Sequence, residues 1–283
     1  MFTAQFMSVA KSVRREIRSL PNITFSDPYM VISLPFPSPL WAPPERFTIK
    51  GGIVTTFQYM GRTIFRNILK EVEDTNFQVG RHGLFLYGPS GRGKSHILAA
   101  LVCHLIKNGK KVMYIPDCVR LLEDHEAYIQ QALLFTFYDD ADAIKAIIRA
   151  QGMHDLLQFI NQQPAFSLYI IVDQCNGLEI GALGVDMKAT SKVVIWDSLH
   201  KLCRSQKYIF SASTNGNSVR FQDRKQSDIK IINMLCGLNE VCPYLSNVLP
   251  YLMFPRMKPM LGSNITLCFC PKVLKKTADT LRT

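Results

Sequence analysis

Along the middle of the chain, short apolar runs alternate with longer stretches that carry one apolar stripe. Residues 84–87 form an apolar run that predicts a buried strand, and residues 94–107 carry apolar side chains at helical spacing. Gly109 follows where a glycine that ends a helix is expected. Further strands are predicted at 112–115, 167–173 and 208–213, with mostly helical residues over 118–163 and a helix over 192–203. Strands separated by helices predict parallel βαβ units with right-handed crossovers.

The first 50 residues follow a different pattern. Residues 2–20 predict an amphipathic helix, in which basic side chains lie between the apolar positions. A mitochondrial presequence has this character, but a helix packed on its own domain is the favoured interpretation. The proline-rich stretch 21–50 predicts an extended arm over the domain surface, and residues 59–74 predict a helix.

Beyond residue 215 the periodicity weakens. A helix is predicted through residues 227–235 and a strand through 265–270, followed by a basic tail. The predicted organisation therefore has three parts, given by the ranges 1–50 (helix and proline-rich arm), 51–215 (α/β core) and 216–283 (a divergent or shortened lid with the tail).

Composition narrows the classes of protein that fit. With 47% hydrophobic and 19% charged residues, the 283-residue chain can bury a large core. The formal net charge of +11 favours anionic partners such as nucleotides, nucleic acid or acidic membrane surfaces. No apolar run reaches the ~20 residues of a membrane span, so none is predicted. The eight cysteines include no CxxC pair, which disfavours a zinc site and favours a reducing, intracellular compartment, the cytoplasm or nucleus.

The first motif that indicates a function is "GPSGRGKS", residues 88–95. It matches the pattern GxxxxGK[ST] and lies between a predicted strand and a predicted helix. Glycines let successive N–H groups point inward as a nest for phosphate oxygens, and the following helix directs its positive end at the same place. Lys94 is expected to reach the β- and γ-phosphates, and Ser95 to ligate Mg²⁺. The predicted nucleotide-binding set is Gly88, Pro89, Ser90, Gly91, Arg92, Gly93, Lys94, Ser95, His96 and Asn215.

The second element with recognisable chemistry is an acidic residue after the strand "LYIIV". Asp173 ends this strand in the manner of a Walker B carboxylate, which holds Mg²⁺ directly or through water. The strand over 208–213 ends in polar residues, of which Thr214 or Asn215 could sense the γ-phosphate; an ordinary loop is an equal alternative. This order predicts an α/β P-loop NTPase, with a mainly parallel sheet flanked by helices, in the additional-strand (AAA/STAND-like) division.

The residue after Asp173 bears on turnover. Many ATPases of this division place a glutamate there to polarise the attacking water, whereas this chain has Gln174. An amide orients water but accepts no proton, so slow hydrolysis is expected. The predicted catalytic residues are Lys94, Asp173 and Gln174. Glu179 could substitute for the missing glutamate, although a solvated loop glutamate is the favoured interpretation. Phosphate charge could be neutralised, from the same or a neighbouring subunit, by Arg220, Arg224 and Lys225, which are more simply interpreted as surface charges.

The stretches "PPERFTIKG", "FQYMGRTIFRNIL", "LFLYGPSGRGKSHILAAL", "KKVMYIPDC" and "YIIVDQCNGLE" together resemble the P-loop NTPase module of Crinkler effectors and of the related retrotransposon-hot-spot proteins. The likeness covers residues 40–240. Its more specific parts are the Asp-Gln-x-Asn form around Gln174 and the "YIPDC" strand. It implies an ATP-binding module, with ATP preferred over GTP, that is joined in longer relatives to a toxin domain and acts in host or self nuclei.

Two function classes fit these residues. The first is an ATP- and Mg²⁺-dependent NTPase with slow hydrolysis coupled to conformational change. The second is a nucleotide-gated module that binds protein or nucleic acid without significant hydrolysis. Direct nucleic-acid binding through scattered basic runs is a third possibility, although such runs are usually solvated faces.

Overall fold

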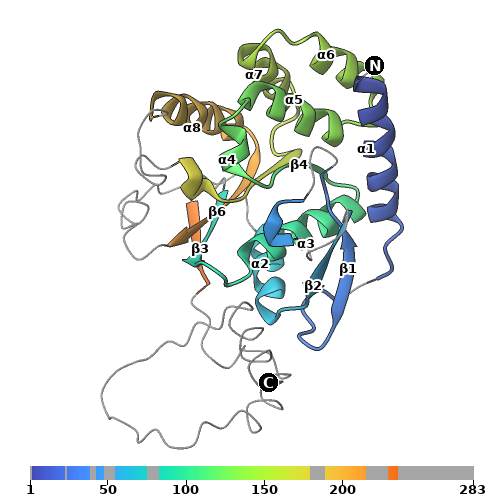
Figure 1. Ribbon diagram of the computed structural model, residues 1–283, viewed down its shortest axis with the longest axis vertical. Coiled ribbons are helices and arrows are strands. Elements are labelled where there is room, and N and C mark those ends of the chain that lie inside the picture. Colours follow the sequence, from blue (N-terminus) through green and yellow to red (C-terminus); the bar gives the residue numbers. More distant parts are fainter. Residues whose placement is uncertain are drawn as a thin grey trace, which may run out of the picture.

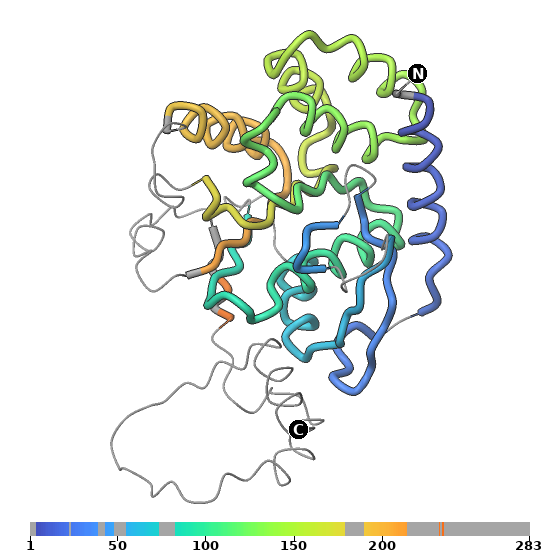
Figure 2. Tube along the Cα trace, in the orientation of Figure 1, coloured from blue at the N-terminus to red at the C-terminus, as the bar shows by residue number. Residues whose placement is uncertain are grey.

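The computed structural model describes the chain in seven ranges, namely 2–22, 24–38, 43–47, 55–74, 83–178, 189–214 and 229–234. Figure 2 draws the remaining residues in grey. Several residues and segments singled out in the sequence lie outside the described ranges: Asn215, Glu179, Arg220, Arg224, Lys225, the strand predicted at 265–270 and the basic tail.

A parallel sheet of five strands forms the centre of the described structure. Its strands are β3 (Gly83–Pro89), β4 (Lys111–Ile115), β5 (Leu168–Val172), β6 (Lys207–Thr214) and β7 (Ile229–Asn233), in the spatial order β4-β5-β6-β3-β7. β6 pairs with both β3 and β5, so it separates the strand before the glycine loop from the strand before Asp173. This inserted strand defines the additional-strand division, and the fold is that of a P-loop NTPase, as the sequence predicted.

Helices cover both faces of this sheet. They are α3 (Lys94–Lys107), α4 (Cys118–Leu121), α5 (His125–Thr136), α6 (Ala141–Arg149), α7 (Met153–Asn161) and α8 (Ala189–Cys203), with a short 3-10 turn η2 (Cys175–Leu178) after β5. α3 and α8 lie on opposite sides of the sheet (Figure 1). Because both faces are covered, every residue of β5 is buried, which explains its uninterrupted apolar sequence.

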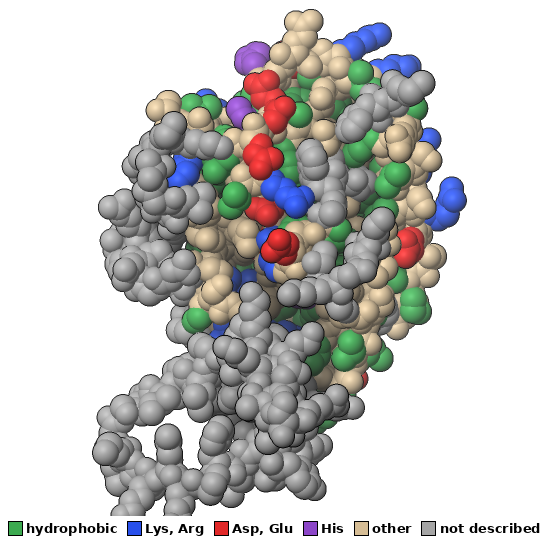
Figure 3. All heavy atoms as spheres, in the orientation of Figure 1, with side chains coloured by type: hydrophobic (Ala, Val, Ile, Leu, Met, Phe, Trp, Pro, Cys, Tyr) green, Lys and Arg blue, Asp and Glu red, His purple; other side chains and the backbone are tan. Residues whose placement is uncertain are grey.

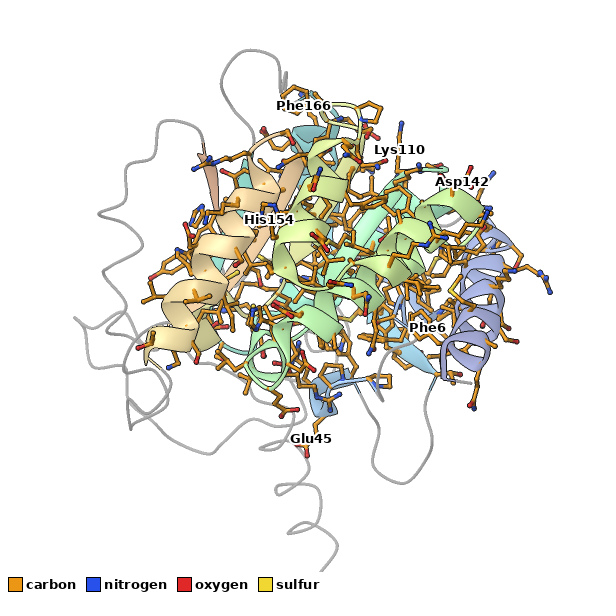
Figure 4. The ribbon with its side chains drawn as sticks, turned by 90° about the horizontal axis from the view of Figure 1, so that it is seen from above. Phe6, Glu45, Lys110, Asp142, His154 and Phe166 are labelled. Atoms are coloured by element: carbon orange, nitrogen blue, oxygen red, sulfur yellow. The ribbon has the colours of Figure 1, made fainter. Side chains whose placement is uncertain are left out.

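The N-terminal segments pack on the α3 side of the sheet. They comprise α1 (Phe2–Arg18), β1 (Val31–Pro35), η1 (Glu45–Phe47), β2 (Thr56–Met60) and α2 (Thr63–Asp74). α1 contacts α3 and α5, and it buries Phe6, Ala10 and Ile17, of which Phe6 points into the body of the molecule (Figure 4). Arg14 is also buried, with its guanidinium over the rings of two aromatic residues, Phe135 and Tyr138. In the structure α1 is therefore a helix packed on its own domain.

Two expectations from the sequence pattern are wrong in detail. The predicted helix over 227–235 is instead the strand β7, which pairs with β3 and extends the sheet. The helix predicted from residue 59 begins at Thr63, because β2 pairs with β1 in an antiparallel ladder that includes Pro35 of the proline-rich arm. In both places a short apolar run fits either period, and its pairing partner decides between them. Among the described residues no helix is long and apolar enough to cross a membrane.

Candidate functional site

The glycine loop lies where β3 ends and α3 begins, at the carboxyl edge of the parallel sheet. Gly91 and Gly93 have φ angles of 80° and 76°, the left-handed region that glycine adopts without steric cost. A Cβ added at Gly91 would meet nothing within 4 Å, whereas one at Gly93 would lie 2.8 Å from Nη1 of Arg62. The same Arg62 atom donates a hydrogen bond to the carbonyl oxygen of Arg92 at 2.5 Å. The loop is therefore open on one side and supported by an arginine on the other.

The N-terminus of α3 carries no side-chain cap. Its N-cap is Gly93, and no side chain accepts a hydrogen bond from the first turn, although the helix has 14 residues. In contrast, the side chains of Asp124 and Asp140 cap α5 and α6 by accepting from the backbone at 3.0 Å. The first N–H groups of a helix have no intrahelical acceptor. At α3 they point into the glycine loop, the arrangement that binds a phosphate or another anion.

Lys94, the first residue of α3, is folded back onto its own loop. Its Nζ donates to the carbonyl oxygens of Gly88 at 2.7 Å and Pro89 at 2.8 Å. Burial lowers the pKa of Lys94 to about 8, while the negative charge of Asp173 acts in the opposite direction. Two of the three ammonium hydrogens are thus used by loop carbonyls, and an anion in the loop would give the cation a stronger partner.

Asp173 directly follows β5 and is only 1% exposed. Its Oδ1 accepts from the hydroxyl of Ser211 on β6 and from the backbone N–H of Gln174 at 2.9 Å. Its own N–H donates to the carbonyl of Ile115, the last residue of β4, at 2.8 Å. Three neighbouring strand ends thus fix this carboxylate, and Ser211, one of the polar residues noted at the end of β6, is its direct partner.

The second oxygen of Asp173 is paired with an arginine from the N-terminal arm. Nη2 of Arg46, in η1, lies 3.2 Å from Oδ2 of Asp173 and also donates to the carbonyl of Pro116. Nη1 of the same guanidinium lies 3.7 Å from Oδ2 of Asp117. Asp117 is the second residue after β4, and its other oxygen caps α4 through the N–H of Val119 at 2.9 Å. Glu45, next to this arginine, is exposed at the rim of the molecule (Figure 4).

Gln174 turns the chain sharply after Asp173. Its φ of 60° lies in the left-handed region, which is uncommon for a residue other than glycine. Its carbonyl accepts from the N–H of Gly177 at 2.8 Å, at the start of the turn η2. Within this turn the side chain of Asn176 accepts from the N–H of Ser213 at 3.2 Å, which ties the loop to the end of β6. The Asp-Gln-x-Asn sequence thus forms one compact turn between the two strand ends.

His96 belongs to an aromatic cluster beneath the loop. Its ring centroid lies 4.7 Å from that of Phe47 and 6.1 Å from that of Phe57. Burial lowers the pKa of His96, and the positive charge of Arg46 adds to the effect. The side chain of His96 therefore packs against these aromatic rings. The group of His96 that we expect to contribute to nucleotide binding is its backbone N–H, in the first turn of α3.

The predicted site residues thus meet at one edge of the sheet, apart from Asn215, which lies outside the described residues. Arg46, Asp117 and Asn176 were not assigned to the site from the sequence. Asn176 and Arg46 both stand inside stretches that the sequence analysis quoted, "YIIVDQCNGLE" and "PPERFTIKG", but neither stretch indicates that Arg46 contacts Asp173. The oxygens of Ser95 and Asp173 are ligands of the type that Mg²⁺ prefers. The buried carboxylate of Asp173 already has a cation, the guanidinium of Arg46, as its partner, so the position beside it suits a positive charge. The described residues contain no cluster of three or more histidine, cysteine or acidic side chains that would hold a metal without a nucleotide.

Comparisons with known proteins give distant likenesses. No protein-family model and no curated protein matches the sequence. The similar solved structures include a DNA replication initiation factor (17% identity, 68% of this chain and 52% of that one, TM-score 0.35), AMPPCP-bound DnaA from Aquifex aeolicus (15%, 75% and 53%, 0.37) and C. elegans PCH-2 (13%, 60% and 40%, 0.30). The chain spans about half the length of the first two. Likenesses this distant assign no function, and the fold assignment rests on the strand order and the loop of the chain itself.

Proposed function

We propose that the chain is an ATP-binding P-loop NTPase module of the Crinkler type, with slow Mg²⁺-dependent hydrolysis coupled to conformational change. The observation that carries the proposal is the uncapped N-terminus of α3 behind a loop with two left-handed glycines, Gly91 and Gly93. Such a loop offers its N–H groups to phosphate oxygens. Lys94 supplies the cation for the β- and γ-phosphates by leaving the carbonyls of Gly88 and Pro89.

Asp173 and Ser95 are the proposed Mg²⁺ ligands. When bound, Mg²⁺ would neutralise the charge of the β- and γ-phosphates. Burial and the hydrogen bonds to Asp173 hold its carboxylate in one orientation, so the carboxylate itself need not turn to meet the metal. The proposed sensor of the γ-phosphate is Thr214 or Asn215, at the end of the neighbouring strand.

Gln174 is the proposed reason for slow turnover. The turn that holds Gln174 beside Asp173 suits an amide that orients water, but the amide cannot take the proton from it. A glutamate there would restore a proton acceptor.

The three-part organisation remains part of the proposal: residues 1–50 as helix and arm, 51–215 as the NTPase core and 216–283 as lid and tail. The resemblance to Crinkler modules further suggests action inside cells, with a host or self nuclear protein or nucleic acid as partner.

The alternative is a nucleotide-gated binding module without significant hydrolysis, and Gln174 is the observation that favours it. Nucleic-acid binding has less support, because basic runs scattered along a sequence are usually solvated faces. The one face shown in Figure 3 carries acidic side chains in a column with basic ones among them. A steep dependence of DNA affinity on salt would be the sign of such binding.

The decisive experiment measures Mg²⁺-dependent release of phosphate from ATP by the purified chain and by three variants. Lys94→Ala is expected to abolish turnover, because it removes the cation that contacts the transferred phosphoryl group. Gln174→Glu is expected to raise turnover at least about tenfold, which is a small part of the ~10²–10⁴-fold that a well-placed general base contributes. Lys107→Ala, at the far end of the same helix, is the matched lysine control and should leave turnover unchanged.

The outcome separates the two proposed classes. If the chain binds ATP but neither it nor Gln174→Glu releases phosphate above the protein-free rate, the hydrolase proposal fails and the gated-binding alternative stands. If ATP does not bind at all, both fail.

A further inference from the structure

Arg46 is the only charged partner that the described residues give to Asp173 within 4.0 Å. The arginine comes from the N-terminal arm, 127 positions earlier in the chain. It reaches Asp173, Asp117 and the carbonyl of Pro116 at once, so a single guanidinium joins the ends of β4 and β5. Phe47 fixes the arm beside it, since this ring is buried against Phe36 at a centroid distance of 4.9 Å and against the ring of His96.

This placement meets an electrostatic requirement. A carboxylate that is 1% exposed needs a cation nearby, because burying an unpaired charge is strongly unfavourable. Ser211 and the N–H of Gln174 both donate to Oδ1, so the charged partner of Asp173 is at Oδ2. A metal ion that takes Oδ2 meets the guanidinium at the same oxygen, and two cations repel each other there.

We propose that Arg46 is a built-in counter-ion that holds the magnesium site of the nucleotide-free chain and must leave Asp173 when the magnesium–nucleotide complex binds. This inference rests on the proposed function, because it concerns the metal that accompanies the nucleotide. Its consequence is that the arm regulates the site: whatever holds Arg46 on Asp173 weakens metal binding, and whatever draws it away strengthens metal binding. The contribution of Mg²⁺ to nucleotide affinity is thus smaller than the loop and Asp173 would give without Arg46.

The test compares nucleotide affinity with and without metal. The Kd of a fluorescent, non-hydrolysable ATP analogue is measured in EDTA and in saturating Mg²⁺. The ratio of the Kd in EDTA to the Kd in Mg²⁺ reports how much the metal strengthens nucleotide binding. Any effect of the arginine charge on the nucleotide alone is already present in EDTA and largely cancels in this ratio. Arg46→Ala is expected to raise the ratio about tenfold, the size of one charge-assisted hydrogen bond.

Two further variants sharpen the comparison. Asp117→Asn keeps an oxygen that can cap α4 but removes one of the charges that hold Arg46, so it should raise the ratio in the same direction and by less. Arg18→Ala, on α1, removes an exposed ion pair with Asp139 and should leave the ratio unchanged. Circular dichroism and gel filtration establish that each variant is folded.

The results of this test distinguish failure of the inference about Arg46 from failure of the proposed function. An unchanged or smaller ratio in folded Arg46→Ala overturns the inference, and a smaller one would make Arg46 a contact to the complex itself. If Arg46→Ala does not fold, Asp117→Asn decides, and an unchanged ratio there overturns the inference as well. If the unsubstituted chain binds no analogue in either condition, the proposed function fails, which is distinct from binding with a ratio insensitive to Arg46.

Discussion

At the scale of single residues, the site of the free chain is internally neutralised. Lys94 is satisfied by the carbonyls of Gly88 and Pro89, and Asp173 is paired with Arg46. Each charge that the proposed nucleotide complex would use already has a substitute partner. Binding therefore exchanges partners instead of creating them, and the affinity for nucleotide depends on the protonation state of Lys94.

Lys94 gives this exchange a pH dependence. Its pKa of about 8 in the free chain means that the ammonium form is dominant at pH 7 and minor at pH 9. Phosphate oxygens favour the charged lysine and raise its pKa in the complex, so affinity is constant below pH 8 and falls above it. ATP affinity measured at pH 7 and pH 9 should differ by about tenfold.

The control for this pH dependence is the pair of lysine variants. Lys94→Ala should bind weakly at both pH values, with the fall between them largely lost, whereas Lys107→Ala should keep it. Equal affinity of the unsubstituted chain at pH 7 and pH 9 would contradict the lowered pKa.

At the scale of elements, the helices differ in how the N–H groups of their first turns are satisfied. Asp117, Asp124 and Asp140 cap α4, α5 and α6, whereas α3 begins at Gly93 with no side chain in that role. Each of these aspartates accepts from one N–H of the first turn of its helix. α7 also begins at a glycine, Gly152, without an N-cap side chain, but the N–H of its first residue, Met153, donates to Glu126 at 3.3 Å. Of these five ends, α3 is the one whose first turn has no such side-chain acceptor, which leaves its N–H groups for a ligand.

The capping role is testable at α6. Asp140→Ala removes the acceptor for the N–H of Ala143, and the free energy of unfolding should fall by about 1 kcal/mol. Asp142→Ala, two positions further on, is the control: its side chain is 95% exposed in the structure and lies at the surface in Figure 4, so the change should stay within about 0.5 kcal/mol. Urea unfolding followed by circular dichroism measures both. Equal losses would mean that Asp140 acts through surface charge and not as a cap.

At the scale of the whole molecule, the N-terminal helix belongs to the same core as the sheet. Phe6, Ala10 and Ile17 of α1 share one hydrophobic cluster with the buried residues of β3 to β6. The arm that follows carries Phe47, in the same cluster, next to Arg46. The core that stabilises the fold thus also holds the arginine on Asp173.

A single cooperative unfolding transition should therefore include α1. Ile17→Ala is expected to lower the free energy of unfolding by about 2–4 kcal/mol, because the side chain is fully buried. Val9→Ala on the same helix is the matched control, since Val9 is 43% exposed and should change stability by less than about 0.5 kcal/mol. An unchanged urea midpoint in Ile17→Ala would show that α1 is not part of the folding unit.

The sequence by itself determined the features that depend on local pattern. The glycine loop, the buried strand before Asp173 and the division of the fold follow from spacing and periodicity over short windows, where side-chain burial and backbone conformation are coupled residue by residue. The strand β7 was missed because a short apolar run carries no period that distinguishes strand from helix, and only pairing with β3 selects one. The tertiary structure alone decided that Arg46 lies on Asp173, because packing of Phe47 against His96 and Phe57 brings the arm to the site, and no local pattern encodes a contact across 127 positions.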